Sequence, residues 1–223
     1  LHLIFSGVGL LLGAWLAYRS YALRLVFFQL LAISLLWFYS TNFKKQLLVG
    51  NIVVSLLTAS VAFIPFVYEI GLMQRLNPSF TSNHTLVILS CFKVIFIFSL
   101  FAFITSMARE IIKDMEDFKG DKATGGYTMP IYWGIPASKL TSFFLIVITV
   151  ILLMFVVYNS FKFYRILFSL HTYYILLALV IPLLILLIMI LKASGPRHFK
   201  NASLLLKFIM LMGLGFSIIF YYN

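Results

Sequence analysis

The chain has 223 residues, of which 63% are hydrophobic and 10% are charged, and its mean hydropathy is +1.07. A soluble domain carries roughly 25% charged residues, so this composition excludes a soluble globular protein and predicts an all-α integral membrane protein. The formal net charge of +11 does not indicate nucleic-acid binding, because basic residues at the ends of apolar helices set topology and meet anionic lipid. The single cysteine, Cys91, excludes an internal disulfide.

Seven apolar stretches are long enough to cross a bilayer as helices, which takes about 20 residues each. They cover residues 1–18, 22–41, 46–68, 85–108, 138–158, 170–191 and 202–222. No linker divides them, so one transmembrane domain is predicted over residues 1–223. Pro65 and Pro182 lie inside two of the stretches and are expected to kink those helices.

Three polar connections, at residues 39–51, 109–134 and 192–201, fall on one side of the membrane if the helices alternate in direction. Lys and Arg are more numerous on this side than on the other. The positive-inside rule therefore predicts that the segment 109–134 faces the cytoplasm.

Five of the chain's 6 acidic residues lie between Glu110 and Asp121. If residues 109–121 form a helix, Asp114, Asp117 and Asp121 share one face at the spacing i, i+3, i+7. Like charges so placed repel one another, and a bound Mg²⁺, which prefers oxygen ligands, would offset the repulsion. The alternative is a solvated acidic helix end whose charges are balanced by nearby lysines. The concentration of acids beside an apolar helix favours the metal site.

The residues around the acids extend this hypothesis. Glycines at 120, 125 and 126 followed by Pro130 predict a loop that could cover a ligand, although a simple turn is the alternative. Basic residues on the same side either mark topology or hold an anion. They are Lys44, Lys45, Arg109 and Lys113. Carboxylates, Mg²⁺ and cations beside apolar helices are what an allylic diphosphate with a lipid tail requires.

At these positions the chain resembles the UbiA superfamily of intramembrane prenyltransferases. The stretch matches R-E-x-x-K-D-x-x-D-x-x-G-D from Arg109 to Asp121, followed by Thr128-Met129-Pro130, where the family has T-L-P. A second stretch is similar to the family's element of a tyrosine, a basic residue and Gly-Asn. It is carried here by Tyr39, Lys44, Lys45, Gly50 and Asn51.

The resemblance implies a nine-helix bundle with a central cavity, where two Asp-rich motifs bind a Mg²⁺–diphosphate complex. It implies that Asp117 and Asp121 are the main metal-associated pair, with Asp114 in support. It assigns the diphosphate to a set of basic residues, Lys44, Lys45, Arg109, Lys113 and Lys122. It also implies that Tyr39 and Asn51 line the pocket.

One feature of the family is missing. No aspartate precedes Asp114, so the motif N-D-x-x-D-x-x-x-D is absent. The chain begins with Leu inside an apolar stretch, and we therefore expect a truncation that removes two helices and leaves the fragment inactive alone.

The implied function is Mg²⁺-dependent transfer of a prenyl group from an isoprenyl diphosphate to a lipophilic acceptor within the membrane. The sequence of residues 35–59 is most similar to bacterial geranylgeranylglycerol-phosphate geranylgeranyltransferases. This resemblance implies that the protein is located in a bacterial inner membrane. Prenylation of an aromatic acceptor, such as a hydroxybenzoate or naphthoate, is the alternative. Outside the enzyme class, an ion-coupled transporter and an inactive assembly subunit remain open.

Overall fold

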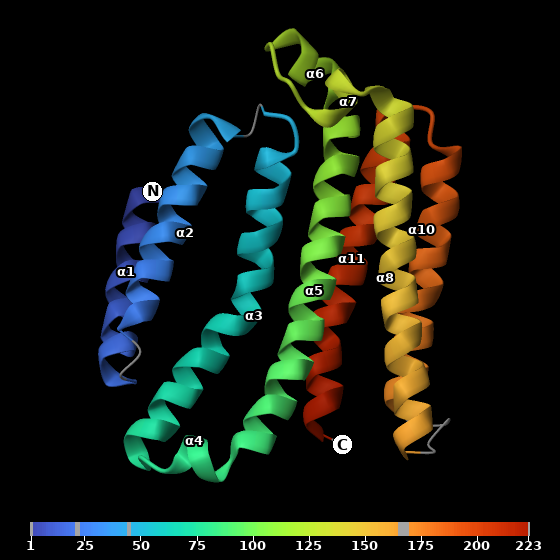
Figure 1. Cartoon of the computed structure of the whole chain (residues 1–223). Helices are drawn as coiled ribbons and strands as arrows, with labels where there is room; N and C mark the ends of the chain where they lie inside the picture. The colour runs from blue at the N-terminus through green and yellow to red at the C-terminus, as the bar shows by residue number, and fades with distance from the viewer. Residues whose placement is uncertain (1, 21–22, 44–45, 165–169, 223) are drawn as a thin grey trace. The chain divides into compact units, whose positions relative to one another are not determined.

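A computed structural model describes residues 2–20, 23–43, 46–164 and 170–222, and within them the regular structure is helical, with no strand (Figure 1). The long helices are α1 (His2–Arg19), α2 (Arg24–Thr41), α3 (Val49–Leu76), α5 (Thr85–Glu116), α8 (Gly134–Tyr164) and α11 (Pro196–Tyr222). Short helices α4 (Phe80–Asn83), α6 (Phe118–Ala123) and α7 (Met129–Tyr132) lie in the connections. The sixth apolar stretch consists of α9 (Leu170–Tyr174), the π-helix η2 (Ile175–Val180) and α10 (Ile181–Lys192).

The predicted membrane helices are present as helices in the described residues, and the protein is an integral membrane protein. Five are long and apolar enough to span a bilayer, at Val49–Leu76, Thr85–Glu116, Gly134–Asn159, Leu170–Lys192 and Pro196–Ile218. The first two predicted spans correspond to the shorter apolar helices Ile4–Arg19 and Leu25–Thr41.

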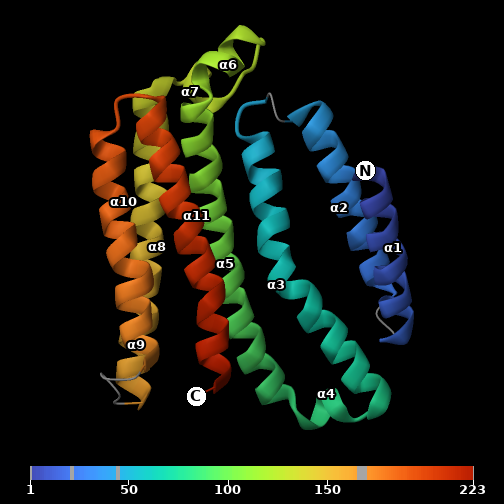
Figure 2. The same cartoon turned by 180° about the vertical axis from the view of Figure 1, so that it is seen from behind.

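Both prolines lie where helix geometry changes. Pro65 lies inside α3, which is visibly bent in both views (Figures 1 and 2). Pro182 lies in the first turn of α10, directly after η2. A π-turn is wider than an α-turn and can accommodate the missing amide donor and the bulk of the proline ring.

The chain divides into two compact units, residues 1–44 with 53–103, and residues 45–52 with 104–223. In the first unit, Ala17, Leu25 and Tyr68 form a buried cluster that joins α1, α2 and α3. Gln29 Nε2 donates a 2.8 Å hydrogen bond to Tyr68 Oη, which donates a 3.1 Å bond to the carbonyl oxygen of Gly13. Polar side chains thus join three apolar helices within this unit. The single domain expected from the sequence stays a prediction.

In the second unit, α10 packs against both α8 and α11 (Figures 1 and 2). Fully buried leucines and isoleucines form its core, at Leu183, Leu186, Ile190, Leu206 and Ile209. The Nζ atom of Lys139, near the start of α8, donates to the carbonyl oxygens of Leu191 and Ala193, each at 2.9 Å. This contact ties the C-terminal end of α10 to α8 at the bundle end that carries α6 and α7.

Candidate functional site

The acidic segment is not one continuous helix, so the expected helix over residues 109–121 is wrong. Helix α5 ends at Glu116, and Asp117 adopts φ −86° and ψ 3° before α6 begins at Phe118. Aspartate is a poor residue for a helix interior, although the Asp117 side chain makes no capping hydrogen bond to α6. The shared face expected for Asp114, Asp117 and Asp121 therefore does not exist as a single helical stripe.

Asp114 is the best-anchored carboxylate of the segment. Asn51, which is buried at the start of α3, donates a 2.8 Å hydrogen bond from Nδ2 to Asp114 Oδ2. This contact joins the two sequence elements that matched the resemblance, although 63 residues separate them. The charges of Glu110, Asp117 and Asp121 act on the same carboxylate. Asn51 thus offsets a local excess of negative charge and fixes one carboxylate oxygen.

Arg109 pairs with its neighbour in the sequence. Its Nη1 atom lies 2.5 Å from Glu110 Oε1, and the glutamate side chain is buried. Adjacent residues on a helix do not face each other, so the pair forms because the arginine side chain is long enough to fold back. Glu110 therefore holds the guanidinium at the end of α5, where it remains partly exposed.

The loop after the acids closes back onto Asp121. Its carbonyl oxygen accepts hydrogen bonds from the Gly126 amide at 2.8 Å and from Thr124 Oγ1 at 3.2 Å. Gly125 has φ +70°, which favours glycine, and a Cβ added to Gly126 would lie 3.1 Å from that carbonyl oxygen. The paired glycines thus serve a tight turn, which the sequence left open as the alternative to a loop that covers a ligand.

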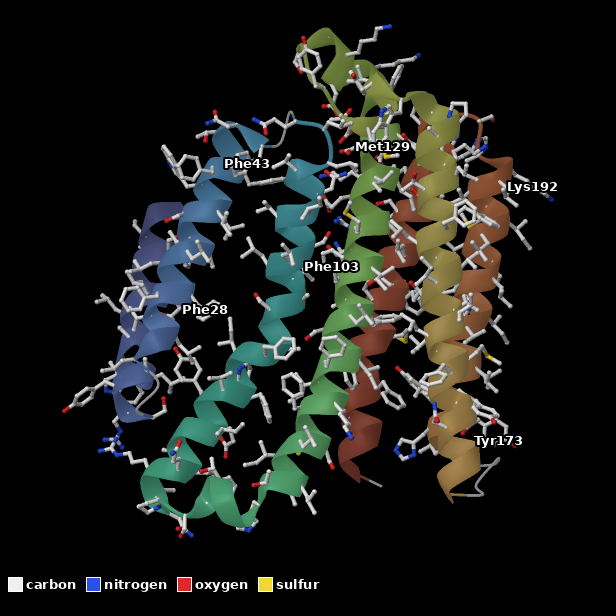
Figure 3. The ribbon with its side chains drawn as sticks, in the orientation of Figure 1. Phe28, Phe43, Phe103, Met129, Tyr173 and Lys192 are labelled. Carbon is white, nitrogen blue, oxygen red and sulfur yellow. The ribbon has the colours of Figure 1, made fainter. Side chains whose placement is uncertain are left out.

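The far end of this loop is anchored in the second unit. Thr128, Met129 and Pro130 are buried, and Met129 lies at the bundle end under the α6 segment (Figure 3). Thr128 Oγ1 is buried without a hydrogen-bond partner among the described residues.

The remaining basic and pocket residues are placed as follows. Lys113 on α5 and Lys122 on α6 are exposed, and Lys122 Nζ lies 5.9 Å from the centroid of the Phe118 ring. Tyr39 lies on α2 in the first unit and is partly buried. Lys44 and Lys45 lie outside the described residues, so their predicted contact with a diphosphate stays a prediction.

The donor set suits Mg²⁺ when a substrate completes it. In the described part of the chain, no three His, Cys, Asp or Glu side chains gather closely enough to enclose an ion. Mg²⁺ does not need such an enclosure, because it retains several waters and commonly uses one or two carboxylates together with substrate phosphates. Asp114 and Asp121, both partly buried, and the exposed Asp117 provide ligands of the right type. Their metal-binding roles stay predictions.

Two contacts at this site could not be predicted from the sequence. The Asn51–Asp114 bond needs a side-chain direction that no motif spacing gives, although both residues were candidates. Glu110 was placed with the other acids, whereas the structure pairs it with Arg109. The only sequence signal for this ion pair was the adjacency of opposite charges, which is weak on a helix.

Comparison with known proteins found one matching family and several relatives. Residues 2–221 match the model of the UbiA prenyltransferase family. A digeranylgeranylglyceryl phosphate synthase of Thermococcus sibiricus is 31% identical over 148 residues, which are 66% of this chain and 43% of that protein. The enzyme of the same name from Methanothermobacter thermautotrophicus is 35% identical over 114 residues, 50% of this chain and 34% of that protein.

These matches cover less than half the length of the curated relatives. Both of these relatives are archaeal, whereas the resemblance of residues 35–59 was to bacterial members of the family. No solved structure matches the chain.

Proposed function

Because the chain belongs to the UbiA prenyltransferase family, we propose that the full-length protein transfers a prenyl group from an isoprenyl diphosphate to the hydroxyl of a lipid acceptor bearing a glycerol phosphate. The observation that carries this proposal is the acidic segment at the end of α5, with Asp114 held by Asn51. The names of the relatives support the choice of acceptor.

In the proposed reaction, the bond between the allylic carbon and the diphosphate oxygen breaks, and the electron pair leaves with the diphosphate. The acceptor hydroxyl oxygen forms the new bond to that carbon and loses its proton. Bound Mg²⁺ would neutralise charge on the diphosphate and so improve it as a leaving group. Asp114, Asp117 and Asp121 would hold that ion.

The protein's cations would act on the same phosphates. Arg109, oriented by Glu110, offers guanidinium donors, and the exposed Lys113 offers an ammonium group. Charged donors of this kind bind phosphate oxygens strongly and stabilise the charge that develops on a departing diphosphate. The apolar helices would exclude water from the allylic cation.

We propose that the acidic segment faces the cytoplasm across the plasma membrane, on the basis of the excess of Lys and Arg on its side of the chain. A cysteine placed at the exposed Lys119, in a Cys91→Ala background, tests this orientation. Labelling by an impermeant thiol reagent is expected only after the cytoplasmic face is opened, and labelling of intact cells would contradict the proposal.

The activity is tested with the full-length protein in lipid vesicles, supplied with labelled geranylgeranyl diphosphate and either geranylgeranylglyceryl phosphate or hydroxybenzoate. We expect a lipid product with the glycerol phosphate acceptor, and loss of product in EDTA that added Mg²⁺ restores. Asp117→Ala is expected to lower the rate by about 100-fold or more, since a metal ion contributes several kcal/mol to such steps.

Glu69→Gln, at an exposed acid on α3 outside the candidate site, is the matched control and should retain activity. Product formation in EDTA, or full activity in Asp117→Ala, would reject the metal mechanism. Product with hydroxybenzoate alone would assign the aromatic acceptor instead.

A further inference from the structure

The segment from α6 to the start of α8 has two unlike sides. Thr128 and Met129 are 3% and 2% exposed. Tyr127, Tyr132 and Trp133, on either side of them in the sequence, are 66%, 65% and 50% exposed. The segment is therefore amphipathic, with a buried anchor toward the bundle and aromatic rings directed outward.

The position of this segment restricts what those rings can contact. It connects the candidate spans that end at Glu116 and begin at Gly134, and it lies at the bundle end of the second unit (Figure 1). An exposed apolar stripe follows on α8, at Leu140, Phe144, Ile148, Ile151 and Phe155. These positions share one helical face, which in a membrane span faces lipid. Trp133 is the C-cap of α7 and directly precedes the first residue of α8, so it lies at the end of this span.

The side chains themselves suit that layer. Tyrosine and tryptophan combine an apolar ring with a polar tip and concentrate at the membrane–water interface. Lys119 and Lys122 on α6 are exposed, and the Lys122 ammonium lies over the Phe118 ring rather than against a carboxylate. Lysines so placed can cover apolar groups with their stems while their charged ends meet lipid phosphates.

We propose that the α6–α7 segment is an interfacial membrane anchor, in which Tyr127, Tyr132 and Trp133 insert into the headgroup layer of the bilayer and Lys119 and Lys122 contact lipid phosphates. The partner is the bilayer that the helices span. The anchor holds the outer side of the loop that closes on Asp121, while Thr128, Met129 and Pro130 hold its inner side.

The test is depth-dependent quenching of tryptophan fluorescence in lipid vesicles. The chain has three tryptophans, so Trp15→Phe with Trp37→Phe leaves Trp133 alone. In a background that also carries Trp133→Phe, Tyr127→Trp and Tyr132→Trp report on the other two positions, and both changes are conservative at exposed sites. Phe144→Trp, on the lipid-facing stripe of α8, is the control for a deep position.

We expect Trp133, Tyr127→Trp and Tyr132→Trp to be quenched more by a spin label at the lipid headgroup than by one deep in the acyl chain. Phe144→Trp should show the opposite order. Emission from the three anchor positions should be blue-shifted from that of free N-acetyltryptophanamide, with lower sensitivity to acrylamide. Raising the content of anionic lipid should lower acrylamide quenching further, and Lys119→Gln with Lys122→Gln should remove that dependence.

Aqueous exposure would overturn the proposal. It would appear as acrylamide quenching at Tyr127→Trp and Tyr132→Trp equal to that of the free indole, with no effect of the headgroup label. Protection from both quenchers would indicate burial against protein instead, and would equally reject a lipid contact. Neither readout depends on prenyl transfer.

Discussion

The two units of the chain use polar side chains in different ways. In the first unit, Gln29 and Tyr68 form a hydrogen-bond chain that ends on the Gly13 carbonyl and joins three apolar helices. In the second unit, Asn51 and Lys139 make their contacts at helix ends, with Asp114 and with the last carbonyls of α10.

This difference follows from the surroundings of each group. A polar group in the hydrocarbon region must be satisfied by protein, because no water is available there. The bonds among Gln29, Tyr68 and Gly13 are therefore structural links. At helix ends, water and phosphate can satisfy the same groups, so side chains there remain available for a ligand. The second unit can carry chemistry at its acidic end because apolar packing holds the rest of it together.

Among these polar contacts, the largest effect is expected from the hydrogen bond that the buried Asn51 donates to Asp114 in the candidate site. Asn51→Leu removes the donor to Asp114 and leaves that carboxylate partly buried without it. We expect the prenyl-transfer rate of the full-length protein to fall by about 10–100-fold, the usual result of losing a residue that orients a ligand side chain. The rate is measured at saturating substrate over a series of Mg²⁺ concentrations.

A double-mutant cycle with Asp114→Asn separates positioning from general damage to the fold. If Asn51 acts through Asp114, the effect of Asn51→Leu should largely disappear in the Asp114→Asn background. Additive losses would show that Asn51 acts independently of the carboxylate.

How much of the fold was predictable depends on the strength of the apolar signal. Long uninterrupted stretches such as 138–158 identified α8, because in lipid the backbone must satisfy its own hydrogen bonds. The break at Asp117 and the π-helix at Ile175–Val180 were missed. The first lies at an aspartate and the second directly before Pro182, and the spacing of apolar residues along a helix does not predict such local changes in backbone geometry.

At the candidate site, residue types were predictable and pairings were not. The motif from Arg109 to Asp121 indicated which residues to consider. The structure then paired Arg109 with Glu110 and Asn51 with Asp114. Those pairs depend on rotamers and, for Asn51, on how residues 49–52 lie against the end of α5 within the second unit, which are tertiary properties.

In the first unit, the close approach at Gly13 offers a sharp test. A Cβ at this position would lie 1.8 Å from Gln29 Nε2, so Gly13→Val should displace that amide from Tyr68. We expect a loss of about 1–3 kcal/mol in unfolding free energy from the overpacking, measured as a lower unfolding temperature in detergent. Gly9→Val, one turn earlier where a Cβ meets nothing within 4 Å, is the matched control. Equal losses in both variants would argue against the close contact.

In the second unit, the corresponding structural link is Lys139. Lys139→Met keeps the length of the side chain but removes the ammonium that caps α10, and we expect about 1–2 kcal/mol of destabilisation, typical of a cation at a partly buried helix C-terminus. Lys192→Met is the control, because Lys192 lies in the same turn of α10 but points away from the bundle (Figure 3). If the two variants unfold at the same temperature, the cap does not stabilise the unit.

The smallest effect should come from a polar link of the second unit that resembles those of the first. Tyr174 Oη donates a 2.9 Å hydrogen bond to the Met212 carbonyl oxygen of α11. A Cβ on Gly215 would lie 2.8 Å from Tyr174 Oη, so the glycine leaves room for the tyrosine hydroxyl. In Tyr174→Phe that carbonyl keeps its own helical donor, so no acceptor is orphaned, and the ring can keep its contact with Phe216. We expect a loss of about 0.6 kcal/mol in unfolding free energy, the average for such bonds between membrane helices, measured as a lower unfolding temperature in detergent.

Tyr158→Phe, at an exposed tyrosine of α8, provides the baseline for this comparison. A loss several times larger would mean that the second unit, like the first, depends on hydrogen bonds between its apolar helices.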